Sequence, residues 1–421
     1  MYCYTGLASY MTLPQRTMAP SNGVDNASVS AKRVVYLSPS FAPYRVPVFE
    51  TLYECIGKGF TVVALSHPRP DIGRVALNLG TFPRRIIKGF SVSLSRFHDR
   101  GEGTPLGLIL SPAFPLVLAI LRPEVVISNN FNLWTLTSIL MGYSTVVFWE
   151  GTPHTERTVR SWRMRLRRWI GSRAKAFVVN GVLSRRYLSD VVEIPRDRIV
   201  EGGLCAEPPP AGVRCGARTL HSGEPVTFLF VGQMIARKGV THLLHAAQLL
   251  NTRLGNKGQF KIILLGDGPE RAHYEREAHE LDIQNRVQFV GYVSPDQVWR
   301  YYEQVHVFVL PTLQDNWPLV VPEAMSTGLP VLVSKRTGSV PDLIREGENG
   351  YSFDPDDHEV FASRLEEYVR DPDLIRRHGG RSLELVSTYN PQRAANAFLW
   401  AVARAKEGTP GQSECQFATS P

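Results

Sequence analysis

The stretch from His306 to Ser334 constrains the fold most, because it predicts a strand, a helix and a second strand in close succession. The apolar run His306 to Leu310 indicates a buried strand, and helix-forming residues follow from Leu319 to Thr327. Glycine and proline at the stop positions end that helix, and Val331 to Val333 forms the next strand. Ligands of such units bind beyond the carboxyl ends of the strands, so we expect Gln314 to Pro318 to line a crevice.

The same alternation of short apolar strands and helical segments recurs along the chain, which predicts parallel, doubly wound sheets in an α/β protein. At 421 residues the chain is too long for one compact core and fits two α/β domains. The segment Ala206 to Pro225 has four prolines and almost no hydrophobic periodicity, so we place the domain boundary there. Further strands are predicted at residues 33–37, 60–65, 125–128, 144–149, 176–180, 226–231, 261–265 and 287–290.

Positive charge is concentrated in the first half of the chain. Residues 1–205 hold 25 Lys or Arg against 13 Asp or Glu, whereas residues 206–421 hold 22 against 26. Eight of the basic residues fall within residues 157–175, where apolar residues at helical spacing predict a basic amphipathic helix. Three interpretations stay open: a helix packed on the sheet with solvated arginines, an interfacial helix on an anionic membrane, and a nucleic-acid-binding element. No recognisable nucleic-acid-binding module accompanies the helix, so no nucleic acid partner is expected.

The cysteines and the apolar stretches bear on the compartment. The five cysteines are scattered, without a C-x-x-C pair, which favours a reducing compartment and argues against a disulfide framework or a zinc site. The first thirty residues lack the pattern of a secretory signal. The longest apolar stretch, Leu106 to Leu121, is shorter than the ~20 residues that span a bilayer, so we expect a buried helix with its neighbouring loop. The predicted location is cytoplasmic, with peripheral membrane contact through residues 157–175.

Asp315 and Glu323 are separated by seven residues, and the chain from Asp315 reads D-N-W-P-L-V-V-P-E-A-M-S-T-G-L-P-V. This pattern resembles the paired-acid motif of retaining glycosyltransferases of family 4 (group 1), usually written E-x7-E followed by A-M-x-x-G-x-P-V. Three further elements resemble that family in the same order: G-Q-M-I-A-R-K-G from Gly232, G-D-G-P from Gly266, and T-G-S-V-P-D-L-I-R-E-G-E-N-G-Y from Thr337.

Three positions depart from the family's usual pattern. Asp315 and Asp342 stand where Glu is usual, and each is one methylene shorter. Gln233 stands where Arg is usual, which leaves one positive charge fewer, and Arg237 is the candidate substitute.

The resemblance implies the GT-B architecture, in which two doubly wound, Rossmann-like parallel-sheet domains face each other across a cleft. The expected order along the chain is a disordered tail (1–31), an acceptor-side domain (32–206), a linker (207–224), a nucleotide-sugar-binding domain (225–389), a helix that crosses back to the first domain (390–406) and a flexible tail (407–421).

The resemblance also implies a site for a nucleoside diphosphate sugar in the second domain. Glu323 is expected to hydrogen-bond the ribose hydroxyls, and Asp315 to lie near the transferred sugar. Lys238, beside a predicted helix N-terminus, is expected to stabilise the charge on the departing diphosphate. The donor-binding residues predicted in this way are Gly232, Gln233, Arg237, Lys238, Gly266, Gly268, Tyr292, Asn316, Pro318, Leu319, Val320 and Glu323.

The first domain contributes His154, which follows the strand at residues 144–149 in the string W-E-G-T-P-H-T-E-R. It resembles the family's histidine that faces the donor sugar, and the implied role is a hydrogen bond to a sugar hydroxyl or to an oxygen that develops charge. With Lys238, Asp315 and Glu323 it completes the predicted catalytic set. The acceptor-side candidates are Tyr44, Arg45 and Glu150; the alternative for Arg45 is a solvated surface position.

The resemblance implies a metal-independent, retaining glycosyltransferase of the hexosyltransferase type that needs no cofactor besides its nucleotide-sugar co-substrate. The predicted acceptor is a hydroxyl of a glycan, a lipid-linked saccharide or another cell-envelope molecule, with an α linkage in the product, as in polysaccharide biosynthesis. Two alternatives stay open: a nucleotide-sugar-modifying GT-B enzyme, such as an epimerase or a phosphorylase, and a non-catalytic basic scaffold that binds lipid or nucleic acid.

Overall fold

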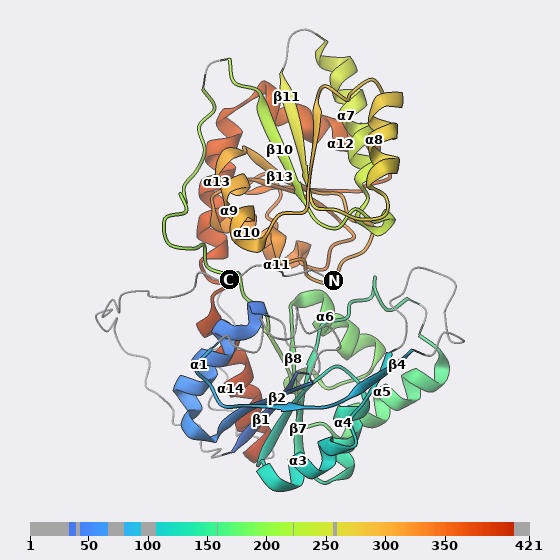
Figure 1. The fold of residues 1–421 in the computed structure, drawn as a ribbon, viewed down its shortest axis with the longest axis vertical. Coiled ribbons are helices and arrows are strands. Elements are labelled where there is room, and N and C mark those ends of the chain that lie inside the picture. The colour runs from blue at the N-terminus through green and yellow to red at the C-terminus, as the bar shows by residue number, and fades with distance from the viewer. Residues whose placement is uncertain are drawn as a thin grey trace.

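The computed structural model of the protein describes residues 33–38, 43–65, 80–93, 107–157, 159–221, 223–255 and 259–407. Both predicted tails lie outside these ranges, apart from residue 407, which ends the last helix. The described residues form one seven-stranded and one six-stranded parallel sheet, each flanked by helices and stacked along the long axis of the molecule (Figure 1). The predicted pair of doubly wound parallel-sheet domains is therefore confirmed.

The first sheet has the strand order β3-β2-β1-β6-β7-β8-β9, with every pair parallel. Its central strands are buried along their whole length, as expected of a parallel sheet covered on both faces. A separate antiparallel hairpin pairs β4 (Phe90–Ser93) with β5 (Gly107–Leu110). The strands of the sheet are β1 (Val34–Ser38), β2 (Phe60–Leu65), β3 (Arg84–Ile87), β6 (Val125–Asn129), β7 (Ser144–Trp149), β8 (Ala176–Val179) and β9 (Ile199–Glu201).

The second sheet has the order β12-β11-β10-β13-β14-β15, again all parallel. The strand, helix and strand predicted around residue 320 are β13, α10 and β14, within one or two residues of the expected bounds. Its strands are β10 (Val226–Val231), β11 (Phe260–Leu265), β12 (Val287–Gly291), β13 (Val307–Leu310), β14 (Val331–Ser334) and β15 (Gly350–Phe353).

Helices cover both sheets (Figure 1). Those of the first domain are α1 (Val46–Ile56), α3 (Ala113–Leu121), α4 (Leu133–Leu140), α5 (Ser161–Arg173) and α6 (Val182–Arg186). Those of the second domain are α7 (Val240–Leu254), α8 (Arg271–Glu280), α9 (Pro295–Gln304), α10 (Val320–Ser326), α11 (Val340–Leu343), α12 (His358–Arg370) and α13 (Asp373–Val386), after which α14 (Pro391–Glu407) ends the described chain.

The last helix, α14, packs on the first sheet although it follows the second one in sequence (Figure 1). The ring of Phe398 meets Tyr36 of β1 at 5.5 Å and Phe148 of β7 at 5.4 Å between centroids, both edge-on. Such aromatic pairs add to the apolar area that the helix buries. The chain therefore passes between the domains twice, once through residues 202–225 and once before α14.

One expectation about apolar residues in the first domain is wrong. The sequence predicts a buried helix with its neighbouring loop at Leu106 to Leu121, but the described residues form the strand β5 and the short helix α3, in which Leu116 and Ile120 are 63% and 69% exposed. Because α3 packs mainly through Phe114 and Leu118, its other face is left bare. In the basic helix α5, Trp162 is exposed, whereas Trp169 packs against the core beneath the helix. Among the described residues no helix is both long and apolar enough to cross a membrane.

Replacing Phe398 with Ala should destabilise the first domain by about 3–5 kcal/mol, because the change leaves a cavity between α14 and two strands. Urea denaturation of the full chain measures this as a lower midpoint for the first domain. The exposed neighbour Asn396→Ala on the same helix serves as control and should change stability by less than about 0.5 kcal/mol. Equal midpoints for the two variants would contradict this packing.

Candidate active site

The loops after β10 and β11 lie against each other at the carboxyl edge of the second sheet, and glycine makes this possible. A Cβ on Gly266 would lie 1.9 Å from the carbonyl oxygen of Gly232, and one on Gly268 would lie 2.4 Å from that of Met234. Gly266 also has a φ of +135°, which other residues rarely adopt. The predicted donor-binding glycines therefore come together in one place, where backbone rather than side chains forms the surface.

A cluster of charges lies beside this edge. Lys238 Nζ is 2.6 Å from Asp315 Oδ2, and Arg237 Nη1 is 3.8 Å from the same oxygen while donating a hydrogen bond to the carbonyl of Gln314. Gly239 holds the short 3-10 helix Ala236–Lys238 close to the loop after β13, since a Cβ there would lie 2.2 Å from the carbonyl oxygen of Pro311. Two loops far apart in sequence thus place two cations on one carboxylate.

Glu323 lies in the first turn of α10, in the same strand–loop–helix unit as Asp315. Its Oε2 accepts a hydrogen bond of 3.1 Å from the hydroxyl of the fully buried Tyr302 on α9. The pKa of this carboxyl is raised from 4.5 to about 7, mainly because the group is buried and also because of the negative charge of Glu207 in the interdomain segment, while the hydrogen bond from Tyr302 opposes the rise. Glu323 is therefore a carboxylate held in poorly solvated surroundings near neutral pH.

His154 lies in the first domain, after the end of β7. The guanidinium of Arg157 lies 3.1 Å from His154 Nδ1, and a guanidinium can only donate, so Nδ1 accepts and the proton of the neutral ring is on Nε2. Burial lowers the pKa of His154, and the positive charges of Arg157 and of Arg336 in the second domain lower it further. His154 is thus a neutral imidazole at the junction of the domains, with an N–H available to donate.

Arg45 and Glu150, two of the acceptor-side candidates, pair with each other. Arg45 Nη2 is 2.9 Å from Glu150 Oε1, and the guanidinium lies over the ring of Phe148 at 4.9 Å from its centroid. The side chain of Arg45 is buried, so the alternative of a solvated surface arginine is wrong. Tyr44 precedes it in the chain, with its ring centroid 5.6 Å from the guanidinium carbon.

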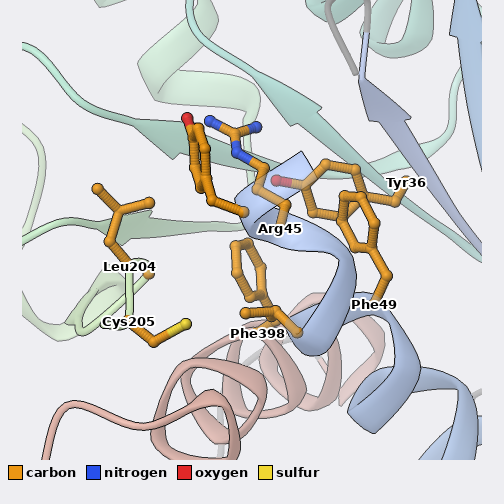
Figure 2. Close-up of a pocket in the computed structure, with 9 residues that line it drawn as sticks. Tyr36, Arg45, Phe49, Leu204, Cys205 and Phe398 are labelled. Atoms are coloured by element: carbon orange, nitrogen blue, oxygen red, sulfur yellow. The ribbon is translucent and has the colours of Figure 1, made fainter. Parts of the chain in front are cut away.

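Arg45 also lines a cavity of about 10 Å³, room for roughly one water molecule. Figure 2 shows Arg45 at its centre, with Tyr36 and Phe49 on one side and Leu204 and Cys205 on the other. Leu204 and Cys205 of the interdomain segment line this cavity, so Arg45 packs where that segment contacts the first domain.

The remaining predicted donor residues are distributed over loops of the second domain. Gln233 follows β10, and Tyr292 follows β12 with 46% of its surface exposed. Asn316, Pro318 and Leu319 lie between β13 and α10, and Val320 begins α10. Within the described parts of the chain no group of three or more His, Cys, Asp or Glu side chains has the geometry of a metal site.

Residues 217–381 match the model of the family described as glycosyl transferases group 1. The matched residues lie almost wholly within the second domain. The recognition made from the motifs is therefore confirmed at the level of group 1.

Two curated relatives match the chain over less than half its length. The sulfoquinovosyl transferase SQD2 of Arabidopsis thaliana is 32% identical over 194 residues, which are 43% of this chain and 36% of that protein. The lipopolysaccharide core biosynthesis glycosyltransferase LpsE of Rhizobium meliloti is 32% identical over 174 residues, 41% of this chain and 48% of that protein. The chain therefore spans between a third and a half of the length of these relatives.

Among solved structures, that of Anabaena HepE in complex with UDP superposes with a TM-score of 0.67 at 14% identity. The match covers 88% of this chain and 99% of that one. At this identity the likeness concerns the fold, and it confirms the predicted GT-B architecture.

Several residues that influence Glu323 and His154 could not be identified from sequence motifs. Tyr302 and Glu207 influence Glu323 from a helix and from a proline-rich segment. The sequence could have suggested Arg157 as a partner of His154, because it lies three positions later. Arg336 comes from the other domain, and its effect on the pKa of His154 could not be predicted from the sequence. Such partners become visible only once the two sheets are placed against each other.

Replacing Glu323 with Gln should raise the melting temperature at pH 8 by about 2 °C or more. The pKa of this carboxyl is higher in the folded chain, about 7, than its ordinary value of 4.5, so its contribution to stability is present at low pH and is lost as the pH rises through 7. Gln stays neutral and avoids that loss. At pH 5 the difference between variant and wild type should fall by more than half in a thermal melt.

The exposed Glu280→Gln on α8 is the matched control and should show no such dependence on pH. A difference for Glu323→Gln that is equal at pH 5 and pH 8 would contradict the assigned cause.

Proposed function

We propose that the protein is a retaining glycosyltransferase that takes a sugar from a nucleoside diphosphate sugar and forms an α linkage to an acceptor hydroxyl. The observation that carries this proposal is the pairing of Lys238 with Asp315 beside the glycine-lined loops, in the domain that matches group 1. The complex of HepE with UDP supports a nucleoside diphosphate donor. The relative named for lipopolysaccharide core biosynthesis supports a glycan or lipid-linked acceptor of the cell envelope.

In this proposal the second domain holds the donor. Glu323, when ionised, accepts hydrogen bonds from the ribose hydroxyls, and the loops at Gly232 and Gly266 lie along the nucleotide. Lys238 and Arg237 stabilise the charge that develops on the departing diphosphate, which is the part a metal ion plays in other transferases. Asp315 orients the ammonium group of Lys238 before the donor binds, because it holds that group at 2.6 Å.

The first domain supplies the hydrogen bond from His154. Its neutral ring donates through Nε2, which suits a sugar hydroxyl or an oxygen that gains charge as the glycosidic bond breaks. The leaving phosphate oxygen takes the proton of the acceptor hydroxyl on the same face, so the anomeric configuration is kept. No protein nucleophile is required for this front-face transfer.

A panel of sugar nucleotides tests the donor, because a ligand that binds the folded state raises its melting temperature by mass action. Turnover of the stabilising donor should then release free UDP or GDP only when an acceptor saccharide is present. Release without acceptor, or interconversion of the sugar, would instead indicate a nucleotide-sugar-modifying enzyme. A protein that binds none of the panel would count against the proposal.

Replacing Lys238 with Ala should lower kcat/KM by about 10²-fold or more, as expected when a group that stabilises charge in the transition state is lost. Lys261→Ala, at an exposed position of β11, is the matched control and should retain wild-type turnover. Kinetics with the donor found in the panel measure both. Wild-type activity of the Lys238 variant would contradict its role.

We further propose that the first domain binds an anionic membrane surface from the cytoplasmic side. Helix α5 carries the basic residues, and the neighbouring helices α3 and α4 expose Leu116, Ile120 and Leu140. Residues 107–175 contain nine Lys or Arg and three Asp or Glu, and two of those acids, Glu150 and Glu156, pair with buried arginines. Basic charge beside exposed aliphatic side chains is the combination that peripheral membrane binding needs.

Sedimentation with vesicles tests this contact. Vesicles with about a third of anionic phosphatidylglycerol should bind the full chain, and neutral phosphatidylcholine vesicles should not. Arg165→Glu on α5 should weaken binding about tenfold or more, since each basic residue near the surface is worth about 1 kcal/mol. Arg276→Glu on α8 changes the net charge equally, and an equal loss for both variants would contradict a defined membrane face.

A further inference from the structure

The segment from Thr337 to Asp342, which runs from the loop after β14 into the short helix α11, touches both domains. On the donor side, the backbone N–H of Gly338 donates to the carbonyl of Asp315 at 2.9 Å. On the other side, a Cβ on Gly338 would lie 2.9 Å from Cγ2 of Thr152, a buried residue after β7 of the first domain. The backbone here is therefore in close contact with the donor-side loop and with the first domain at once.

Asp342 makes the most specific of these contacts. Its Oδ1 accepts a hydrogen bond of 3.1 Å from the backbone N–H of Val182, the first residue of α6 in the first domain. Its Oδ2 accepts one of 3.3 Å from the indole N–H of Trp317, which lies in the donor-side loop between β13 and α10. The carboxylate is nearly buried, and hydrogen bonds to a charged acceptor are among the stronger ones in proteins.

Gly181 allows this approach. A Cβ at that position would lie 1.9 Å from Asp342 Oδ2, so any side chain would force the two domains apart. The φ of Gly181 is −172°, an extended conformation open to all residues, so the glycine is needed for space and not for backbone strain.

We propose that Asp342 is an interdomain positioning residue, whose carboxylate joins the donor-side loop at Trp317 to the first domain at Val182. The bound sugar would thereby be aligned with His154 and with the acceptor. Asp342 touches neither donor nor acceptor and acts through the geometry of the two domains. The kinetic part of this inference rests on the proposed transferase function, whereas the contact itself does not.

Two variants break the contact from opposite sides. Asp342→Asn keeps the volume, but its single amide oxygen can accept from only one of the two N–H donors. Gly181→Ala leaves the second domain untouched and inserts a methyl group where the carboxylate lies. Gly380→Ala in α13 is the matched control, because a Cβ there meets nothing within 4 Å.

Hydrogen exchange of the full chain without ligand tests the contact. Exchange of the Val182 amide should rise tenfold or more in Gly181→Ala, while the amides of β8 keep their wild-type rates. In Asp342→Asn, either the Val182 amide or the indole N–H of Trp317 should exchange tenfold or more faster, because only one of them keeps its acceptor. Gly380→Ala should behave as wild type throughout. Wild-type protection of Val182 in Gly181→Ala, together with wild-type protection of both N–H groups in Asp342→Asn, would overturn the contact.

Kinetics test the positioning role. With the donor and acceptor found by the panel, both variants should lower kcat tenfold or more, while the Kd for UDP, or for GDP if the wild type does not bind UDP, stays within twofold. A loss of nucleotide affinity equal to the loss of kcat would overturn the proposal, since Asp342 would then only support the donor domain. Absence of turnover in the wild type would refute the transferase function and leave the exchange result to decide the contact.

Discussion

Parallel pairing is the constraint on which the rest of the second domain depends. Because β10 pairs in parallel with both β11 and β13, all three strands end at the same edge of the sheet, and their following loops meet there. At that edge, glycines allow the backbones of the loops after β10 and β11 to touch, and charged side chains lie between the loops after β10 and β13. The ion pair between Lys238 and Asp315 joins two of these loops across 77 positions of sequence. The chemistry proposed for the site follows from this placement.

The two domains are joined by more than the chain between them. The helix α14 returns to the first sheet and packs Phe398 against two of its strands. The hydroxyl of Tyr389, just before that helix, donates to the carbonyl of Asp342, and its carbonyl accepts from the backbone N–H of Ala206. The returning helix, the interdomain segment and the positioning residue therefore meet through one tyrosine. A change in the angle between the domains would therefore alter the contacts of the helix α14, the interdomain segment and Asp342 together.

Much of the fold could be predicted from the sequence, because buried parallel strands are short apolar runs with clear stops. The bounds of β13 and α10 differ from the predicted ones by a residue or two. The failures concern surfaces. The apolar sequence of α3 suggested burial, but a nine-residue helix packed by Phe114 and Leu118 cannot bury every apolar side chain. Exposure depends on which face finds a neighbour, and periodicity does not show this when all positions are apolar.

The residues of the candidate site could also be predicted only in part from the sequence. Motif spacing pointed to Lys238, Asp315 and Glu323, and the structure brings the first two into contact. The motif spacing could not show that the hydroxyl of Tyr302 lies 3.1 Å from Glu323. Nor could it show that Arg45 and Glu150 pair with each other, because 105 residues separate them and each alone is an ordinary surface residue type.

The two acids that replace Glu in the family pattern have a feature in common. Asp315 lies 2.6 Å from Lys238, in a loop held close by Gly239, and Asp342 lies so close to Gly181 that a methyl group would not fit between them. Gly239 brings two backbones together at the first place, and Gly181 leaves room for the carboxylate itself at the second. Each shorter acid keeps polar partners at its position: Lys238 for Asp315, and Val182 and Trp317 for Asp342.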